Sequence, residues 1–198
     1  MILFENVAYL ASDERRLAAW KTFRTRIGAK PERVLAAPAA RLLAITRAGI
    51  LAADRVEKVR EVASIAIDEF DGDLAGALDR APAAARRALK KFPGIGDPGA
   101  DRILLFSGRQ KILALDSNGL RVLLRLGFGT EGKGYAASYR SAQDATRSQW
   151  PGDFGGLIRA HQLLRRHGQE ICKRSHPLCE RCPVTRHCAY FRSRSTRA

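Results

Sequence analysis

The sequence predicts an all-α protein, and two observations carry this prediction. No stretch of useful length alternates apolar and polar residues with the period of two that is typical of a β-strand. Apolar residues instead recur every three or four positions through nearly the whole chain, as they do along the buried face of a helix. Capping residues, glycines and prolines separate these segments, which predicts about ten short helices.

The helices are expected in the following order. A helical segment over residues 6–27 breaks at the capping pair Ser12 and Asp13. It continues with Leu17, Trp20 and Phe23 on one face. Further helices are predicted over residues 31–35, 41–48, 53–70 and 82–92, with a turn at 71–73, and others begin at about Pro98, Asn118, Tyr135 and Phe154.

The charge of the chain is strongly positive. Its 198 residues include 35 Lys and Arg against 20 Asp and Glu, a formal net charge of +15. A field of this sign attracts polyanions, above all nucleic acid, which it binds through phosphate contacts with release of counterions. The alternative is an arginine-rich composition without such a partner. Because 45% of the residues are hydrophobic, the chain can form a real core.

The sequence has neither a predicted membrane span nor a predicted signal peptide. No stretch approaches the roughly 18–20 apolar residues of a membrane span. The first residues, M-I-L-F-E, lack the basic region and the cleavage site of a signal peptide. We therefore expect a cytoplasmic, nucleoid-associated protein without a membrane partner.

All four cysteines lie in one 17-residue window, with the spacing C-x6-C-x2-C-x5-C. In a reducing compartment, thiols this close together are typical of a metal centre rather than of disulfides. Structural zinc usually uses two C-x2-4-C pairs, and only Cys179 and Cys182 form such a pair. A [4Fe–4S] cluster accepts wider and uneven gaps. The candidate metal ligands are Cys172, Cys179, Cys182 and Cys188.

Residues 89–100, L-K-K-F-P-G-I-G-D-P-G-A, lie between two amphipathic helices. The glycines permit positive φ and a close approach of the backbone to another surface. Asp97 is expected to be the N-cap of the second helix and Pro98 its first residue, so that the free N–H groups of this helix face outward. Such a corner can bind phosphate, although P-G-x-G also occurs in plain helix corners. The candidate DNA contacts here are Lys90, Lys91, Gly94, Gly96 and Gly99.

The segment F-P-G-I-G at residues 92–96 is similar to the helix-hairpin-helix motif of the endonuclease III superfamily, roughly L-P-G-V-G. The cysteine spacing matches the iron–sulfur loop of the endonuclease III and adenine-glycosylase branches residue for residue. Over about residues 6–190 the chain therefore resembles the endonuclease III-like DNA glycosylases of base excision repair. In that family the loop presents basic side chains to DNA, which implies contacts from Arg174 and His176; the alternative is a solvated basic surface.

The resemblance implies a fold and a cofactor. It predicts a helical barrel domain over residues 1–110, with the helix-hairpin-helix at about 86–105. A smaller helical domain over residues 111–198 would contain Asp116 and a [4Fe–4S] cluster loop at 172–188. Double-stranded DNA with a damaged or mispaired base would be the partner of a monomeric protein, with the base flipped into the site.

Asp116 occupies the place of the family's essential aspartate, at the end of the apolar stretch I-L-A-L and before the pattern D-x-N-x-x-R-V. Breaking an N-glycosidic bond develops oxocarbenium character at the sugar, and a fixed carboxylate stabilises this charge or orients the attacking water. The alternative is that Asp116 only caps the following helix.

The chain departs from the family at two places. Bifunctional members have a lysine where this chain has Pro98, and without an amine no Schiff base can form there. The family's S-x-Q loop, whose glutamine probes the space of the flipped base, corresponds to Y-L-A-S-D at residues 9–13. The resemblance therefore implies a monofunctional hydrolase, and it leaves open which base this hydrolase removes. The alternatives are a bifunctional glycosylase and lyase with a displaced lysine, such as Lys111, and a non-catalytic DNA-binding damage sensor.

Overall fold

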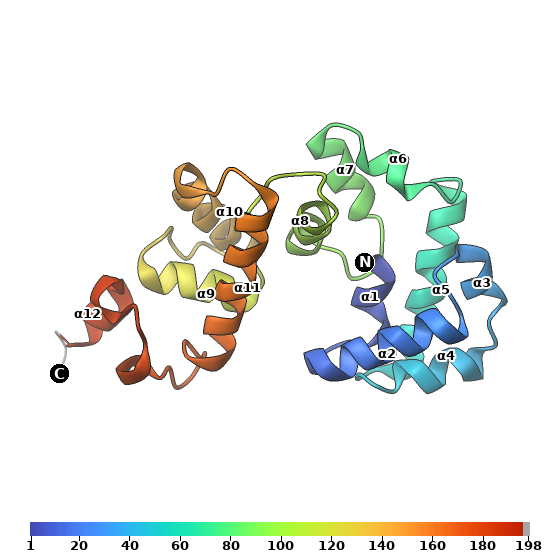
Figure 1. Cartoon of the computed structure of the whole chain (residues 1–198), viewed down its shortest axis with the longest axis horizontal. Helices are drawn as coiled ribbons and strands as arrows, with labels where there is room; N and C mark the ends of the chain where they lie inside the picture. The colour runs from blue at the N-terminus through green and yellow to red at the C-terminus, as the bar shows by residue number, and fades with distance from the viewer. Residues whose placement is uncertain (196–198) are drawn as a thin grey trace. The chain divides into compact units, whose positions relative to one another are not determined.

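The computed structural model describes residues 1–195, and Figure 1 follows the chain through them from blue to red. The described residues form twelve α-helices, three short 3₁₀ turns and connecting loops, without a strand, so the all-α prediction is confirmed. The chain divides into two compact units, Met1–Ile103 and Leu104–Ala198. No helix within the described part is long and apolar enough to cross a membrane.

The first unit is built from the first eight helices, of which the last extends by three residues into the second unit. They are α1 (Ile2–Val7), α2 (Asp13–Arg26), α3 (Pro31–Ala36), α4 (Ala39–Thr46), α5 (Ala52–Asp68), α6 (Leu74–Leu78), α7 (Pro82–Leu89) and α8 (Asp97–Phe106). Ser12 caps α2 as predicted, because its hydroxyl accepts a hydrogen bond from the backbone N–H of Arg15 at 3.3 Å.

Three predictions about these helices were wrong in detail. α1 begins at Ile2 rather than at Asn6, and α8 begins at Asp97, so Asp97 is its first residue rather than its N-cap. The short helix α6 was not predicted, because its sequence L-A-G-A-L contains a central glycine, which is a weak helix former. The carboxylate of Asp73 stabilises α6 by accepting a hydrogen bond from the backbone N–H of Gly76 at 3.1 Å.

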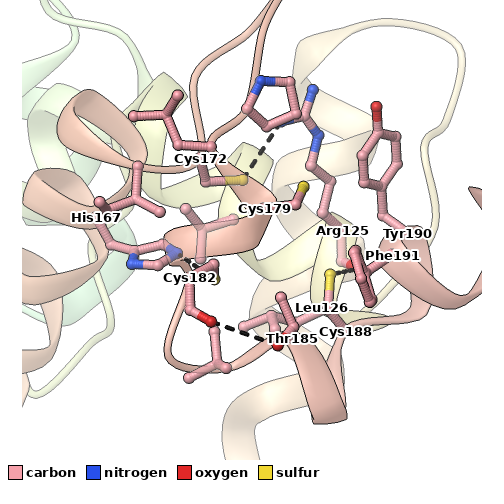
Figure 2. Close-up of a pocket in the computed structure, with 15 residues that line it drawn as sticks. Arg125, Leu126, His167, Cys172, Cys179, Cys182, Thr185, Cys188, Tyr190 and Phe191 are labelled. Carbon is pink, nitrogen blue, oxygen red and sulfur yellow. Dashed lines mark hydrogen bonds between the residues drawn. The ribbon is translucent and has the colours of Figure 1, made fainter.

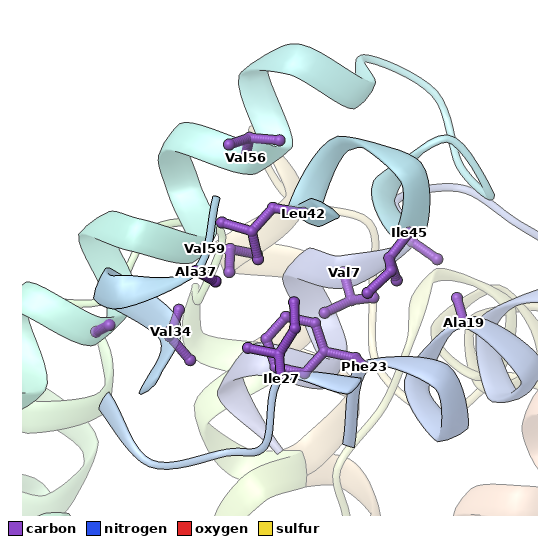
Figure 3. Packing of buried hydrophobic residues seen from close by; sticks show 12 residues of the cluster. Val7, Ala19, Phe23, Ile27, Val34, Ala37, Leu42, Ile45, Val56 and Val59 are labelled. Carbon is purple, nitrogen blue, oxygen red and sulfur yellow. The ribbon is translucent and has the colours of Figure 1, made fainter. Parts of the chain in front are cut away.

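The core of the first unit is aliphatic around one phenylalanine, and Figure 3 shows how its side chains interdigitate. Phe23 is fully buried and stacks on Trp20, with ring centres 5.8 Å apart. Leu17, predicted on the same face, is 48% exposed because the buried face of α2 runs through Ala19 and Phe23 instead. The buried members of this core are Val7, Ala8, Ala19, Phe23, Ile27, Val34, Ala37, Leu42, Ile45, Val56, Val59 and Ala63.

The second unit has its own core, in which α9 packs along α11. Its elements are α9 (Ser117–Leu126), α10 (Tyr135–Thr146), the 3₁₀ turn η1 (Arg147–Gln149), α11 (Phe154–Glu170), the 3₁₀ turns η2 (Cys179–Arg181) and η3 (Thr185–His187), and α12 (Ala189–Ser195). The approach of α9 and α11 is so close that a Cβ added to Gly168 would lie 2.7 Å from the backbone oxygen of Asn118.

The apolar stretch before Asp116 runs through this second core as an extended, buried segment, residues 112–115. Its backbone groups are bound by buried side chains rather than by a neighbouring strand. Gln143 donates to the carbonyl of Leu113 at 3.0 Å, and His161 Nδ1 lies 2.8 Å from the carbonyl of Ala114. These hydrogen bonds satisfy buried polar groups that an isolated extended segment would leave unpaired, and they fix the point at which the chain reaches Asp116.

Candidate functional site

The hairpin between α7 and α8 lies in the first unit and is anchored by two apolar side chains. Phe92 is 2% and Ile95 5% exposed, and the ring of Phe92 stacks on Phe70 with centres 5.6 Å apart. The glycines that alternate with them, Gly94 and Gly96, are exposed. The corner therefore presents its smallest residues outward, the arrangement expected of a surface that another backbone can approach closely.

Asn6 supports this corner from beneath. Its buried amide Nδ2 donates to the carbonyls of Pro93 at 3.0 Å and of Ile2 at 3.1 Å. Gly94 has a φ of +76°, and a Cβ added there would lie 3.3 Å from Asn6 Oδ1. Gly94 therefore needs to be glycine for conformational reasons. Gly96 does not, because its φ is not positive and an added Cβ would meet only Pro98 Cδ at 3.8 Å.

The candidate lysines of the hairpin both have carboxylate partners. Lys90 Nζ lies 2.8 Å from Asp97 Oδ1, and Lys91 pairs with Glu69. Both lysines remain about half exposed, with 45% and 54% of their side chains accessible. Gly99, the remaining candidate, lies inside the first turn of α8, where an added Cβ would make an ordinary contact with Ile95 at 3.5 Å.

In the second unit, Asp116 is the N-cap of α9. Its Oδ1 accepts a hydrogen bond from the backbone N–H of Gly119 at 2.7 Å. Its Oδ2 accepts one from Asn118 Nδ2 at 3.1 Å and lies 3.5 Å from Arg165 Nε. The side chain is nevertheless 17% exposed. Oδ1 thus caps the helix, whereas Oδ2 is held near the surface by Asn118 and Arg165. Asp116 can therefore cap α9 and still offer a carboxylate oxygen for chemistry.

Asp116 and the cysteine loop are joined by one chain of hydrogen bonds through Arg121 of α9. The Arg121 Nη2 donates to Asn118 Oδ1 at 2.9 Å and to the carbonyl of Gly168 at 2.7 Å, and its Nε donates to the carbonyl of Cys172 at 2.9 Å. Burial lowers the pKa of the Arg121 guanidinium, against the opposing effect of Cys172. The D-x-N-x-x-R pattern is therefore a connected unit in space.

All four cysteines line one pocket in the second unit, as Figure 2 shows. Each thiol is partly exposed, and the other lining side chains are mostly apolar, among them Val122, Leu126 and Ile171. His167 also lines the pocket, with Nε2 3.6 Å from Cys182 Sγ, and burial lowers its pKa. The predicted DNA contacts Arg174 and His176 are exposed on the same loop.

The pocket differs from a site for a single ion. In residues 1–195 no three or more His, Cys, Asp or Glu side chains converge closely enough to hold one metal ion. A zinc ion needs its thiolates within about 2.3 Å of one point, whereas the corners of a [4Fe–4S] cluster are farther apart. Four cysteines around one apolar pocket are compatible with the ligand set of the predicted cluster.

Three residues of this region were not singled out from the sequence: Arg125, Arg165 and His167. Arg125 lies four residues after Arg121, so a helical projection of α9 places both on one face. Arg165 and His167 had no such signal. Their partners, Asp116 and Cys182, are distant in sequence, and only the packing of α11 brings them together.

The chain thus combines an all-helical fold, a glycine-rich hairpin, a capping aspartate and a four-cysteine pocket, and known proteins with a similar sequence or fold exist. No family model matches the chain. The endonuclease III of Sulfolobus acidocaldarius is 25% identical over 182 residues, which cover 91% of this chain and 77% of that protein. The endonuclease III of Thermotoga maritima is 26% identical over 71% of this chain and 59% of its own length.

Other relatives are described as glycosylases. The thymine/uracil-DNA glycosylase of Methanothermobacter thermautotrophicus is 26% identical over 74% of this chain and 61% of its own length. Among solved structures, a trapped endonuclease III–DNA covalent intermediate matches with a TM-score of 0.76 at 20% identity, covering 98% of this chain and 84% of that one. A thermostable thymine-DNA glycosylase matches with a TM-score of 0.73 at 20% identity, covering 97% and 83%. The chain is thus endonuclease III-like in sequence and fold, which confirms the predicted resemblance.

Proposed function

We propose that this chain is a DNA glycosylase of base excision repair, which flips a damaged or mispaired base and hydrolyses its N-glycosidic bond. The observation that carries the proposal is the placement of Asp116, whose carboxylate is fixed by three polar partners and still reaches the surface. The relatives named as endonuclease III and as thymine/uracil-DNA glycosylase support the same reaction class.

Asp116 supplies the electrostatics of bond cleavage. As the glycosidic bond lengthens, positive charge develops on the sugar, and a carboxylate that is already held in place stabilises it without reorganising. The base leaves with the bonding electron pair, a water molecule adds to the sugar carbon, and the proton that this water loses ends on the departing base. Arg165 and Asn118 hold the Oδ2 atom, so they restrict the rotation of the carboxylate.

The proposed activity is monofunctional. Pro98, the second residue of α8, has no amine with which to form a Schiff base. Lys111 is a poor substitute, because it and Asp116 contact different parts of α11. Lys111 Nζ lies 5.8 Å from the ring centre of Phe154, the first residue of α11. Asp116 instead pairs with Arg165, which lies about 16 Å further along the axis of that helix. A bifunctional enzyme with another displaced lysine is the alternative.

Cys172, Cys179, Cys182 and Cys188 would hold a [4Fe–4S] cluster. The cluster, when bound, supplies a rigid, redox-active centre that organises the loop. The loop then offers Arg174 and His176, and the hairpin offers Gly94, Gly96, Gly99, Lys90 and Lys91, to the phosphates of double-stranded DNA. We further propose that the protein acts as a monomer, in the cytoplasm and associated with the nucleoid. Its two domains would be residues 1–110 and 111–198.

A panel of duplexes, each with a single lesion or mispair, tests the function. The purified protein is incubated with each duplex, and half of each sample is treated with alkali. A glycosylase without lyase activity produces strand breaks at one class of base only after alkali. Tight binding to lesion-containing duplexes without excision of any base would support the alternative that the protein is a non-catalytic damage sensor.

A further inference from the structure

Arg125, in the last turn of α9, makes contacts that neither the proposed excision chemistry nor the end of a helix requires. Its Nη1 donates to the carbonyl of Lys173 at 2.7 Å and lies 3.3 Å from Cys172 Sγ. Its Nη2 donates to the carbonyl of Arg174 at 2.9 Å. One guanidinium therefore holds three consecutive residues, beginning with the first cysteine of the loop.

The same side chain also contacts the far end of the loop. The guanidinium carbon of Arg125 lies 4.6 Å from the centre of the Tyr190 ring, and Tyr190 follows the last cysteine by two residues. The main-chain carbonyl oxygen of Arg125 lies 3.3 Å from Cys188 Sγ. In Figure 2 the Arg125 side chain stands between Cys172 and Tyr190, while Cys188 lies beside its backbone.

We propose that Arg125 is a positioning residue for the metal ligands: its guanidinium bridges the two ends of the cysteine loop, at Cys172 and at Tyr190, and holds them against α9. The inference rests on the cofactor proposed above. It concerns the assembly and the electronic state of the centre rather than the excision of a base.

The chemistry of arginine explains why this residue type is suited to the task. Its planar group presents several N–H donors in a fixed fork and stacks on an aromatic face at the same time, which the single ammonium of lysine does not do. Holding both ends of a 17-residue loop also lowers the conformational entropy that metal binding has to overcome.

The contact with Cys172 Sγ has a second consequence. A cationic N–H group directed at a ligand sulfur withdraws electron density from the centre and favours its reduced state. Arg125 should therefore raise the reduction potential of the cluster as well as slow the loss of iron.

Four variants of the full chain separate these effects. Arg125→Gln removes the charge and the stacking, Arg125→Lys keeps the charge alone, and Tyr190→Leu removes only the stacking partner. Arg147→Gln is the control, because Arg147 is also a cation of the second unit but is 65% exposed and pairs with Asp144, outside the cysteine pocket. Each is reconstituted anaerobically with iron and sulfide, and iron content, iron release to a chelator and midpoint potential are measured without DNA.

We expect Arg125→Gln to release iron several-fold faster and to have a lower midpoint potential than the native chain. Arg125→Lys should keep a potential close to native but release iron as fast as Arg125→Gln. Tyr190→Leu should release iron faster at an unchanged potential, and Arg147→Gln should behave as the native chain. Circular dichroism confirms that each variant is folded; if Arg125→Gln is not, the other two carry the test.

Native release rates and a native potential in Arg125→Gln would overturn the role of Arg125. A native chain that purifies with zinc and no iron would remove the proposed cofactor, and this inference with it. An iron-loaded chain that excises no base would contradict the proposed function and leave the role of Arg125 standing.

Discussion

At Asp116, one side chain combines a structural and a proposed chemical function, and a single substitution separates them. Asparagine is as good an N-cap as aspartate, because its side-chain oxygen accepts the same backbone hydrogen bond. Asp116→Asn should therefore keep α9 folded and lower the thermal stability only slightly, through loss of the contacts of Oδ2 with Asn118 and Arg165. Base excision should fall by roughly 10²–10⁴-fold, the scale for loss of a positioned catalytic group. Single-turnover excision and a melting curve check both parts.

The control for Asp116→Asn is Asp153→Asn. Asp153 caps α11 in the same way, accepting from the N–H of Gly156 at 2.8 Å. This second cap substitution should leave excision unchanged. Equal losses in the two variants would mean that Asp116 acts only as a cap, and full activity in Asp116→Asn would remove it from the mechanism.

Pro98 leads to a second prediction at the scale of the residue. The native protein should leave intact abasic sites, and borohydride should trap little covalent protein–DNA complex, because no amine stands at position 98. Pro98→Lys should increase trapping, since the second position of a helix accepts lysine without strain. Efficient trapping by the native chain would show that a displaced lysine acts as the nucleophile.

Individual residues were predictable from the sequence where their role is local. Ser12 caps α2, and Asp116 caps α9, because a cap needs only the residue and the helix that follows it. Arg165 was missed because its partner Asp116 lies on another element and no local pattern connects them. Leu17 is predicted on one face with Trp20 and Phe23 but is largely exposed, because helical spacing defines a face and not how much of its width is buried.

At the scale of the element, the hairpin gives a prediction with an internal control. Gly94→Ala and Gly72→Ala replace glycines of nearly equal φ, +76° and +75°. Each should therefore cost about 1 kcal/mol of stability from the left-handed backbone alone. Only Gly94→Ala also crowds Asn6 beneath the corner, so it alone should weaken binding to all DNA sequences alike. Equal DNA affinities of the two variants in fluorescence anisotropy would argue against the hairpin as a phosphate contact.

The crossing of α9 and α11 gives another prediction. A Cβ at position 168 would lie 2.7 Å from the backbone oxygen of Asn118, so Gly168→Ala should force the helices apart and cost about 1–3 kcal/mol. Gly99→Ala, also within a helix, meets nothing closer than 3.5 Å and should leave the stability equal or slightly higher. Chemical denaturation of both variants measures the difference.

Helix starts were predicted within one or two residues at most positions, because caps and prolines are local signals. The missed helix α6 is five residues long and depends on the Asp73 cap more than on its own propensity. The extended segment before Asp116 was recognised as apolar. Its anchoring by Gln143 and His161 was not predictable, because these residues lie on two later helices.

At the scale of the whole molecule, the charge of +15 predicts how DNA binding responds to salt. Each phosphate neutralised contributes about −0.9 to the slope of log K against log salt concentration. The affinity for an undamaged duplex should therefore fall as the salt concentration rises, with a slope of minus several units on the log–log plot. Anisotropy titrations at a series of salt concentrations measure it, and an affinity independent of salt would contradict phosphate contacts as the main source of binding.

The position of the cysteines along the chain has a consequence for biosynthesis. Every cysteine follows α11, and the elements that receive the loop, α9 and α11, precede it. Since chains are made from the N-terminus onward, α9 and α11 are synthesised before all four thiols are present. The cluster that we propose can therefore gain its full set of ligands only after nearly the whole second unit has been synthesised.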